Sequence, residues 1–219
     1  GSAIEFDGVN DFQNTDYIRV DDSGALPRGS DDFSISLKIN FNSIDAISDK
    51  VLFATSQLDQ CSLSVSRANK GLMFFSGGNN IIAPTSLSWN MGQWYDIAVT
   101  KVGNDYTIYR DGVVTGSANS SQTNGSSLAN NDFTFGRRSE NAHPIHGKLD
   151  EIKIFKTGIS ATDITHLNAN ENLNYDGLSK SIATDGLVAE DPTATGNNED
   201  PGATKIPAGS VISDDPTAI

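Results

Sequence analysis

Hydrophobic and polar residues alternate along many short stretches of the chain, which is the pattern of half-buried β-strands. The clearest stretch is 33–41, where apolar side chains occupy every second position from Phe33 to Phe41. The same reasoning predicts further strands at 51–55, 62–67, 72–76, 94–101, 106–110, 113–116, 132–136 and 148–155. Strands that recur about every ten residues, joined by tight turns, indicate an all-β antiparallel sandwich rather than an α/β fold.

Turn and capping residues mark where these strands end. Gly77-Gly78-Asn79-Asn80 predicts one turn, and Asp111-Gly112 predicts a two-residue hairpin, because these residue types readily adopt the conformations that such turns require. The only helix that the sequence predicts is 160–167, where Ser160 is the expected N-cap and Asp163 lies three positions later. We expect this short helix to follow the last strand.

Residues 177–219 differ in composition from the rest of the chain. They contain no aromatic residue and four of the seven prolines, and from Asp176 onward eight acidic residues accompany only two lysines. Such a segment cannot bury enough apolar surface to offset the entropy of ordering. We therefore predict a β-domain at 1–175 and an acidic, Asp-Pro-rich segment at 176–219. That segment is either an extended linker toward a following module or a tail that docks on the domain.

The overall charge excludes several classes of function. Lys and Arg number 15 against 28 Asp and Glu, which gives a formal net charge of -13. This charge argues against binding to nucleic acid and to anionic membrane surfaces. No apolar run approaches the length of a membrane-spanning helix, so we expect no membrane insertion. The single cysteine, Cys61, leaves no intrachain disulfide and no cysteine-based zinc site.

Five segments, in this order, resemble laminin-G-like jelly-roll domains of the concanavalin A-like lectin and glucanase superfamily. They are Ala3-Ile4-Glu5-Phe6-Asp7 with Tyr17 to Val20, the strand at 32–39, Met91-Gly92-Gln93-Trp94 with the strand that follows, Tyr109-Arg110-Asp111-Gly112, and the closing strand at 147–155. The resemblance covers about residues 3–167 and implies a jelly-roll sandwich in which the first and last strands are neighbours. It is specific for the fold but not for a ligand.

A calcium site is expected near the start of this domain. Asp7-Gly8-Val9-Asn10-Asp11 is a tight, oxygen-rich turn, and calcium prefers roughly six to eight oxygen ligands. In similar jelly rolls a calcium ion is held at about this place. We therefore expect structural calcium bound by Asp7, Asn10, Asp11 and Asp150, the last from the closing strand. The alternative is that these side chains only bond to their own backbone, as turn-forming residues do.

The segment 137–146 concentrates side chains that can bind sugar hydroxyls or carboxylates, in a domain otherwise poor in basic residues. We expect ligand contacts from Arg137, Arg138, Asn141, His143 and His146, although a solvated loop would have the same composition. The short His143-x-x-His146 spacing, without a third strong ligand nearby, argues against zinc.

Aromatic residues supply one more candidate. Trp89 lies in a connection, where it could stack on a sugar ring or cover the edge of a sheet. Trp94 begins a strand and is expected in the core. Phe74-Phe75 places one ring on each face of its strand, so one of the two should reach the core.

The sequence predicts a binding module rather than an enzyme. Glucanases of this superfamily resemble one another in a Glu-x-Asp-x-x-Glu strand, whereas the closing strand here has the adjacent acids Asp150 and Glu151, which face opposite sides. We predict a non-catalytic, calcium-stabilised binding or adhesion module that recognises carbohydrate. The alternatives are a structural spacer of a surface adhesin and, less favoured, a degenerate glycoside hydrolase.

The expected partners are a glycan or other cell-surface ligand and neighbouring modules of a larger chain. Because the sequence begins with Gly1-Ser2 rather than methionine, we expect a domain taken from a longer protein. The acidic, lysine-poor and nearly cysteine-free composition is typical of extracellular repeats, so we expect a bacterial cell-surface or secreted location.

Overall fold

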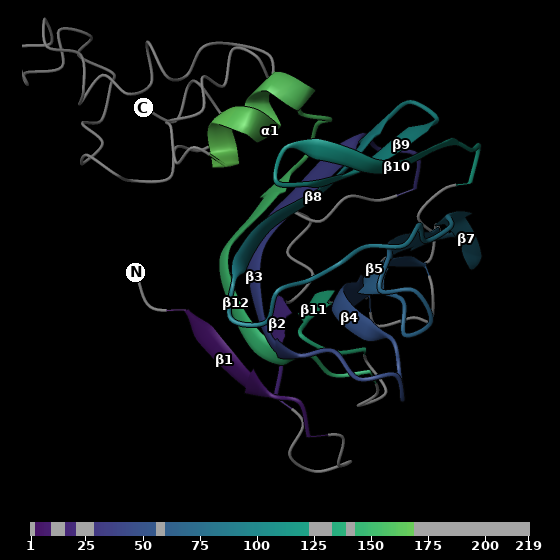
Figure 1. The fold of residues 1–219 in the computed structure, drawn as a ribbon. Coiled ribbons are helices and arrows are strands. Elements are labelled where there is room, and N and C mark those ends of the chain that lie inside the picture. The colour runs from purple at the N-terminus through teal and green to yellow at the C-terminus, as the bar shows by residue number, and fades with distance from the viewer. Residues whose placement is uncertain are drawn as a thin grey trace, which may run out of the picture. The chain divides into compact units, whose positions relative to one another are not determined.

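The computed structural model describes residues 3–9, 16–20, 29–55, 60–122, 133–138 and 143–168. The chain divides into two units, Gly1–Gly158 and Ile159–Ile219. All the described strands belong to the first unit, and the described helix belongs to the second (Figure 1). The predicted site residues Asn10, Asp11 and Asn141, and the segment 176–219, lie outside the described residues.

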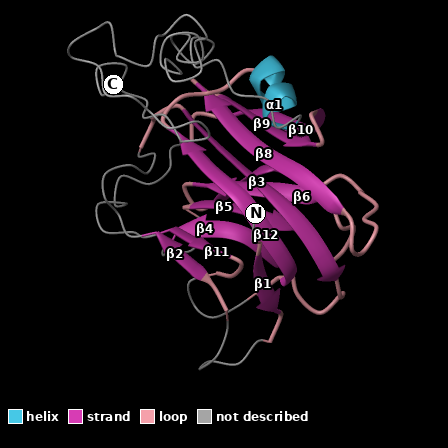
Figure 2. Cartoon of the chain, turned by 90° about the vertical axis from the view of Figure 1, so that its left-hand side faces the viewer, coloured by secondary structure: helices cyan, strands magenta, loops and turns pink. Residues whose placement is uncertain are grey.

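The first unit consists of two six-stranded sheets. Sheet A has the order β1-β12-β3-β8-β9-β10, formed by Ile4–Asp7, His146–Phe155, Phe33–Ser43, Trp94–Val102, Asp105–Arg110 and Val113–Asn119. Sheet B has the order β2-β11-β4-β5-β6-β7, formed by Ile18–Val20, Phe133–Phe135, Lys50–Thr55, Cys61–Val65, Leu72–Ser76 and Asn79–Ile82. The described pairings are antiparallel, and the two sheets face each other (Figures 1 and 2). This arrangement confirms the predicted jelly-roll sandwich, including the pairing of the first strand, β1, with the last, β12.

The core lies between the two sheets and is rich in aromatic rings. Phe33 of sheet A and Phe74 of sheet B have ring centroids 6.2 Å apart, and Phe53 and Phe133 within sheet B are 5.8 Å apart. These distances are typical of favourable aromatic pairs. Cys61 is also fully buried here, and burial raises the pKa of its thiol far above the ordinary value, which keeps the thiol protonated. The core therefore fixes the strands on which the outward side chains are carried.

Two local predictions about the strands are wrong. Gly77 and Gly78 form the expected turn, but Asn79 and Asn80 already belong to β7. Trp94, expected in the core, is 40% exposed. The register explains this, because Tyr95 pairs with Ile39 on the inward face and Trp94 pairs with Asn40 on the outward face. The turn before β8 predicted where this strand begins, but it did not predict which side chains of the strand face the core.

The predicted helix is confirmed as α1, Ala161–Asn168. Ser160 Oγ accepts a hydrogen bond from Asp163 N at 3.1 Å, and Asp163 Oδ2 accepts one from Ser160 N at 2.8 Å. This reciprocal capping satisfies two backbone donors at the start of the helix. Within the described part of the chain, no helix has the length and apolar character needed to cross a membrane.

Candidate functional site

Alternation along the central strands of sheet B points a set of side chains away from the core. Ala54 of β4, Ser62 of β5 and Phe75 of β6 form one row of directly paired residues. Val51, Ser64 and Met73 form a second row on the same three strands. Directly paired residues share one face of a sheet, so the two rows form a continuous outward surface. Its centre has small side chains and its β6 side has large apolar ones.

A hollow of about 100 Å³ lies over this surface. The two rows line it together with Asp49, Arg138 and His143. The structure thus brings together two of the residues predicted as ligand contacts, Arg138 and His143, and adds residues that the prediction did not include. We name this feature the sheet B hollow.

The backbone beside β4 places Arg138 and His143 at the hollow. Gly136 has a φ of 91°, and a side chain there would collide with the ring of Phe6, so only glycine fits this turn after β11. Gly136 N donates to Leu52 O at 3.0 Å, and Val51 N donates to His143 O at 3.0 Å. The segments on both sides of residues 139–142 therefore run along β4 at the level of the hollow.

His143 is held in a costly conformation. Its φ of 61° lies in the left-handed region, which non-glycine residues rarely adopt. Its Nδ1 is buried and has no hydrogen-bond partner among the described residues. Metal-binding and general-base histidines usually have the second ring nitrogen fixed by a hydrogen bond, so this setting argues against both roles. A contact to a ligand hydroxyl makes no such demand.

Asp49 lies beyond the Val51 row, because it precedes Lys50, which pairs with Val65. Asp49 Oδ1 accepts a hydrogen bond from Arg67 N at 2.8 Å. The preceding loop is fixed by Lys50 Nζ, 3.0 Å from Asp45 Oδ2. Desolvation raises the pKa of Asp45, but the hydrogen bonds from Lys50 and from the backbone of Ile47 outweigh it and lower the pKa. Asp49 is therefore a fixed carboxylate at one end of the hollow.

The floor of the hollow keeps unused hydrogen-bonding capacity. The hydroxyls of Ser62 and Ser64 make no hydrogen bond to any other described residue. Beside them lie the half-buried ring of Phe75 and the side chain of Met73, which is buried except for the part that lines the hollow. Free hydroxyls next to an aromatic ring suit a ligand that has both hydroxyl groups and an apolar face.

The predicted ligand residue Trp89 lies elsewhere. Its Nε1 donates to Lys70 O at 2.8 Å, and its ring packs edge-on against Phe41 and Tyr95 at centroid distances of 5.2 and 4.8 Å. Phe41 belongs to the core. The structure therefore favours the alternative of a covering role over a stacking platform, although Trp89 packs against the core rather than over a sheet edge.

Two further predicted ligand residues do not line the sheet B hollow either. The Arg137 guanidinium stacks 3.6 Å from the ring of Tyr17, and the Arg137 side chain is buried. His146 begins β12 in sheet A, and its Nδ1 lies 2.9 Å from Ser43 Oγ. Neighbours in sequence are separated here because the chain crosses from sheet B to sheet A between residues 138 and 146.

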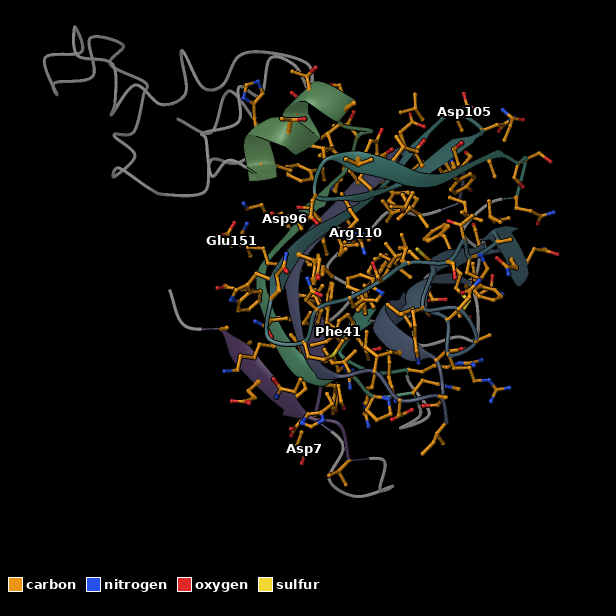
Figure 3. The ribbon with its side chains drawn as sticks, in the orientation of Figure 1. Asp7, Phe41, Asp96, Asp105, Arg110 and Glu151 are labelled. Atoms are coloured by element: carbon orange, nitrogen blue, oxygen red, sulfur yellow. The ribbon has the colours of Figure 1, made fainter. Side chains whose placement is uncertain are left out.

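Of the four predicted calcium ligands, the structure describes Asp7 and Asp150, and the register does not bring these two together. Asp7 pairs with His146 at the start of β12, whereas Asp150 pairs with Lys38, four residues farther along β12 and so about 13 Å away. In Figure 3, Asp7 lies at the end of β1 that is farther from Glu151, the sequence neighbour of Asp150. Asp7 Oδ1 accepts from Val9 N at 2.8 Å, as a turn-forming aspartate does. Among the described residues, no three acidic, histidine or cysteine side chains form a group that could hold a metal.

The lining residues that the prediction missed could have been found from the strand pattern. Ser62, Ser64, Met73 and Phe75 occupy the outward positions of strands that the alternation had identified. The expectation that one of Phe74 and Phe75 reaches the core is confirmed by Phe74. No pattern in the sequence indicated that this outward face would be hollowed.

Comparison with known proteins agrees with the fold. The family model described as the concanavalin A-like lectin/glucanases superfamily matches residues 12–165. The chain belongs to this superfamily. Comparison with curated protein sequences gives no match.

Solved structures of this superfamily fold include domain 4 of AbnA, a GH43 extracellular arabinanase from Geobacillus stearothermophilus, in complex with arabinotriose. It has a TM-score of 0.59 and 20% identity, and the match covers 76% of each chain. A heptameric SAP-like pentraxin from Limulus polyphemus matches with a TM-score of 0.56 and 13% identity over 76% of this chain and 81% of the other. A proposed carbohydrate-binding protein from Bacteroides ovatus ATCC 8483 matches with a TM-score of 0.54 and 16% identity over 74% of this chain and 45% of the other. At these identities the likeness shows the fold alone.

Proposed function

We propose that the chain is a non-catalytic carbohydrate-binding module and that the sheet B hollow is its binding site. One observation carries the proposal: the hydroxyls of Ser62 and Ser64 have no hydrogen-bond partner among the described residues and lie beside the apolar side chains of Phe75 and Met73. A sugar ring has an apolar face and a rim of hydroxyls, so it can use both kinds of surface at once. Arg138 and Asp49 add a forked donor and an acceptor at the edges.

The composition of the hollow also supports a role without catalysis. Hydrolysis of a glycosidic bond ordinarily needs two carboxylic groups on opposite sides of the bond. Among the described residues that line the hollow, Asp49 is the only acid, and one of its oxygens is already bonded to Arg67 N. Incubation with the oligosaccharides that bind, followed by assay of new reducing ends, tests this point. Release of reducing ends above the buffer control contradicts it.

The proposed contacts come from protein side chains alone, so calcium is not part of the proposed binding mechanism. The proposed setting is extracellular, on a bacterial surface or in a secreted protein, which the acidic and nearly cysteine-free composition supports. The similar arabinanase domain was solved with arabinotriose, which makes arabino-oligosaccharides reasonable first ligands to test.

The direct test is glycan binding by calorimetry, first with arabino-, xylo-, cello-, manno- and galacto-oligosaccharides. We expect binding in the wild type and a loss of about tenfold or more in the Ser62→Ala/Ser64→Ala double variant, because each lost hydrogen bond contributes about 1 kcal/mol. Ser36→Ala is the matched control, since Ser36 lies on the outward face of sheet A. Equal affinity in the double variant and the wild type would move the binding site away from the hollow.

A further inference from the structure

The sheet B hollow has walls of different chemistry on different sides. Met73 and Phe75 lie two residues apart on β6 and form an apolar wall parallel to the strands. Arg138 and His143 lie beside β4 and form a polar wall opposite. The floor between them consists of small side chains from β4 and β5, including Ser62 and Ser64.

Asp49 lines one end of the space between these walls. Asp49 lies beyond the row of Val51, Ser64 and Met73, and its carboxylate is fixed by Arg67 N. A ligand that enters between the walls therefore meets the Asp49 side chain at this end.

The volume sets a limit on how much ligand enters. The hollow has a volume of about 100 Å³. A cavity of about 150 Å³ in a protein core holds one benzene ring, whereas pockets for drug-sized ligands measure roughly 300–1,000 Å³. The sheet B hollow is smaller than the benzene cavity but partly open to solvent, so it takes no more than one sugar ring, and part of that ring stays outside.

We propose that the sheet B hollow receives a single sugar ring, either the terminal unit of a glycan or a branch one sugar long. This inference rests on the proposed function and specifies its ligand. The ring lies with its apolar face on Phe75 and Met73, and its hydroxyls reach Ser62 and Ser64. Asp49 excludes an internal unit, because an internal unit has a further sugar at each end. The remainder of the glycan stays outside and contributes little to affinity.

The test is the dependence of affinity on chain length. Each of the five oligosaccharide series is titrated from the monosaccharide to the pentasaccharide by calorimetry. For the series that binds, we expect the disaccharide and the pentasaccharide to differ by less than about threefold. A rise of tenfold or more between them would overturn the inference while leaving the proposed function intact. No binding by any member of the panel would contradict the proposed function itself, and the inference with it.

Variants of Asp49 test the closed end directly. Asp49→Ala removes the blocking side chain, so we expect the pentasaccharide to gain about tenfold over the disaccharide. Asp49→Asn is the matched control, because the amide keeps the size and can still accept from Arg67 N, and it should keep the flat length dependence. A flat dependence in Asp49→Ala would show that Asp49 does not limit the chain.

A measurement that needs no variant provides a second check. In saturation-transfer NMR with the wild-type protein and the bound trisaccharide, we expect the strongest transfer to protons of one terminal ring. Equal transfer to all three rings would overturn the inference, because it would show contact along the whole chain.

Discussion

The two outward faces of the sandwich use their polar side chains differently. On sheet A, charged groups bond to one another: Lys38 Nζ lies 2.6 Å from Asp96 Oδ1, and Lys153 Nζ lies 3.2 Å from Glu151 Oε2. Asp96 and Glu151 lie together on that side of the molecule (Figure 3). On sheet B, the hydroxyls of the hollow have no such partners among the described residues.

This difference shows which face keeps its capacity to bind a ligand. Groups that already bond to one another must exchange those bonds for ligand bonds, so little free energy is gained. Unpaired hydroxyls beside apolar surface lose only water when a ligand arrives. Exposed aromatic area alone does not distinguish the faces, because Trp94 lies exposed on sheet A. The faces differ in whether the polar groups near the aromatic residue already have hydrogen-bond partners.

The largest predicted effect is a difference in the free energy of unfolding between a variant in the core and a variant in the hollow above it. Phe74 and Phe75 are neighbours on β6, but Phe74 is 0% exposed and packs against Phe33 and Tyr106, whereas Phe75 lines the hollow. We expect Phe74→Ala to lower the free energy of unfolding by about 3–5 kcal/mol and Phe75→Ala by about 1 kcal/mol. Urea denaturation measures both. Similar losses in the two variants would show that Phe75 supports the fold rather than the hollow.

The next effect compares the two outward faces directly. We expect Phe75→Ala to weaken binding of the best oligosaccharide by about tenfold, a loss of about 1.4 kcal/mol. Trp94→Ala removes a larger and exposed ring from sheet A, and we expect it to change affinity by less than about twofold. Calorimetric titration of both variants, after their melting temperatures have been compared, checks this. A greater loss in Trp94→Ala would place the binding site on the wrong face.

The sequence predicted the fold better than the site, for a physical reason. Alternation of period two identifies strands, so β3 followed directly, as did the expectation that one ring of Phe74 and Phe75 lies in the core. Which strands lie side by side can follow from topology, as for β1 and β12. The register between two strands does not follow from topology. Asp7 pairs with His146, which lies four residues before Asp150 on β12, so the two acids are apart. The hollow depends on side-chain sizes across three strands, which become visible only once their register is known.

A smaller effect concerns pH and the paired charges of sheet A. Burial raises the pKa of Asp96 from its ordinary value of 3.8, and the charges of Asp111 and Glu151 add to this, although Lys38 opposes it. The folded state therefore holds the Asp96 proton to a higher pH than the unfolded state does. This contribution to stability is lost as pH rises through the range just above 3.8.

The measurement is the free energy of unfolding as a function of pH, in the wild type and in Asp96→Asn. We expect the wild type to lose stability, relative to the variant, as the pH rises above 3.8, the ordinary pKa of an aspartate. The slope is compared and not the absolute value, because the substitution also removes the charge that pairs with Lys38. A constant difference between the two proteins over this range would be evidence that Asp96 titrates as it does in the unfolded chain.

The smallest expected effect concerns calcium and the charged face of sheet A. Asp150 pairs with Lys38 on the neighbouring strand, and its Oδ1 accepts a hydrogen bond from Glu151 N at 2.8 Å. The Asp150 carboxylate is therefore held by its own backbone and lies apart from Asp7. We expect Asp150→Asn to leave the difference in melting temperature between calcium and chelator as it is in the wild type. Loss of a calcium-dependent shift in Asp150→Asn would mean that Asp150 is a ligand after all. Asp7→Asn, measured in parallel, separates the turn after β1 from the middle of β12: a loss confined to this variant would locate any bound calcium at that turn, about 13 Å from Asp150.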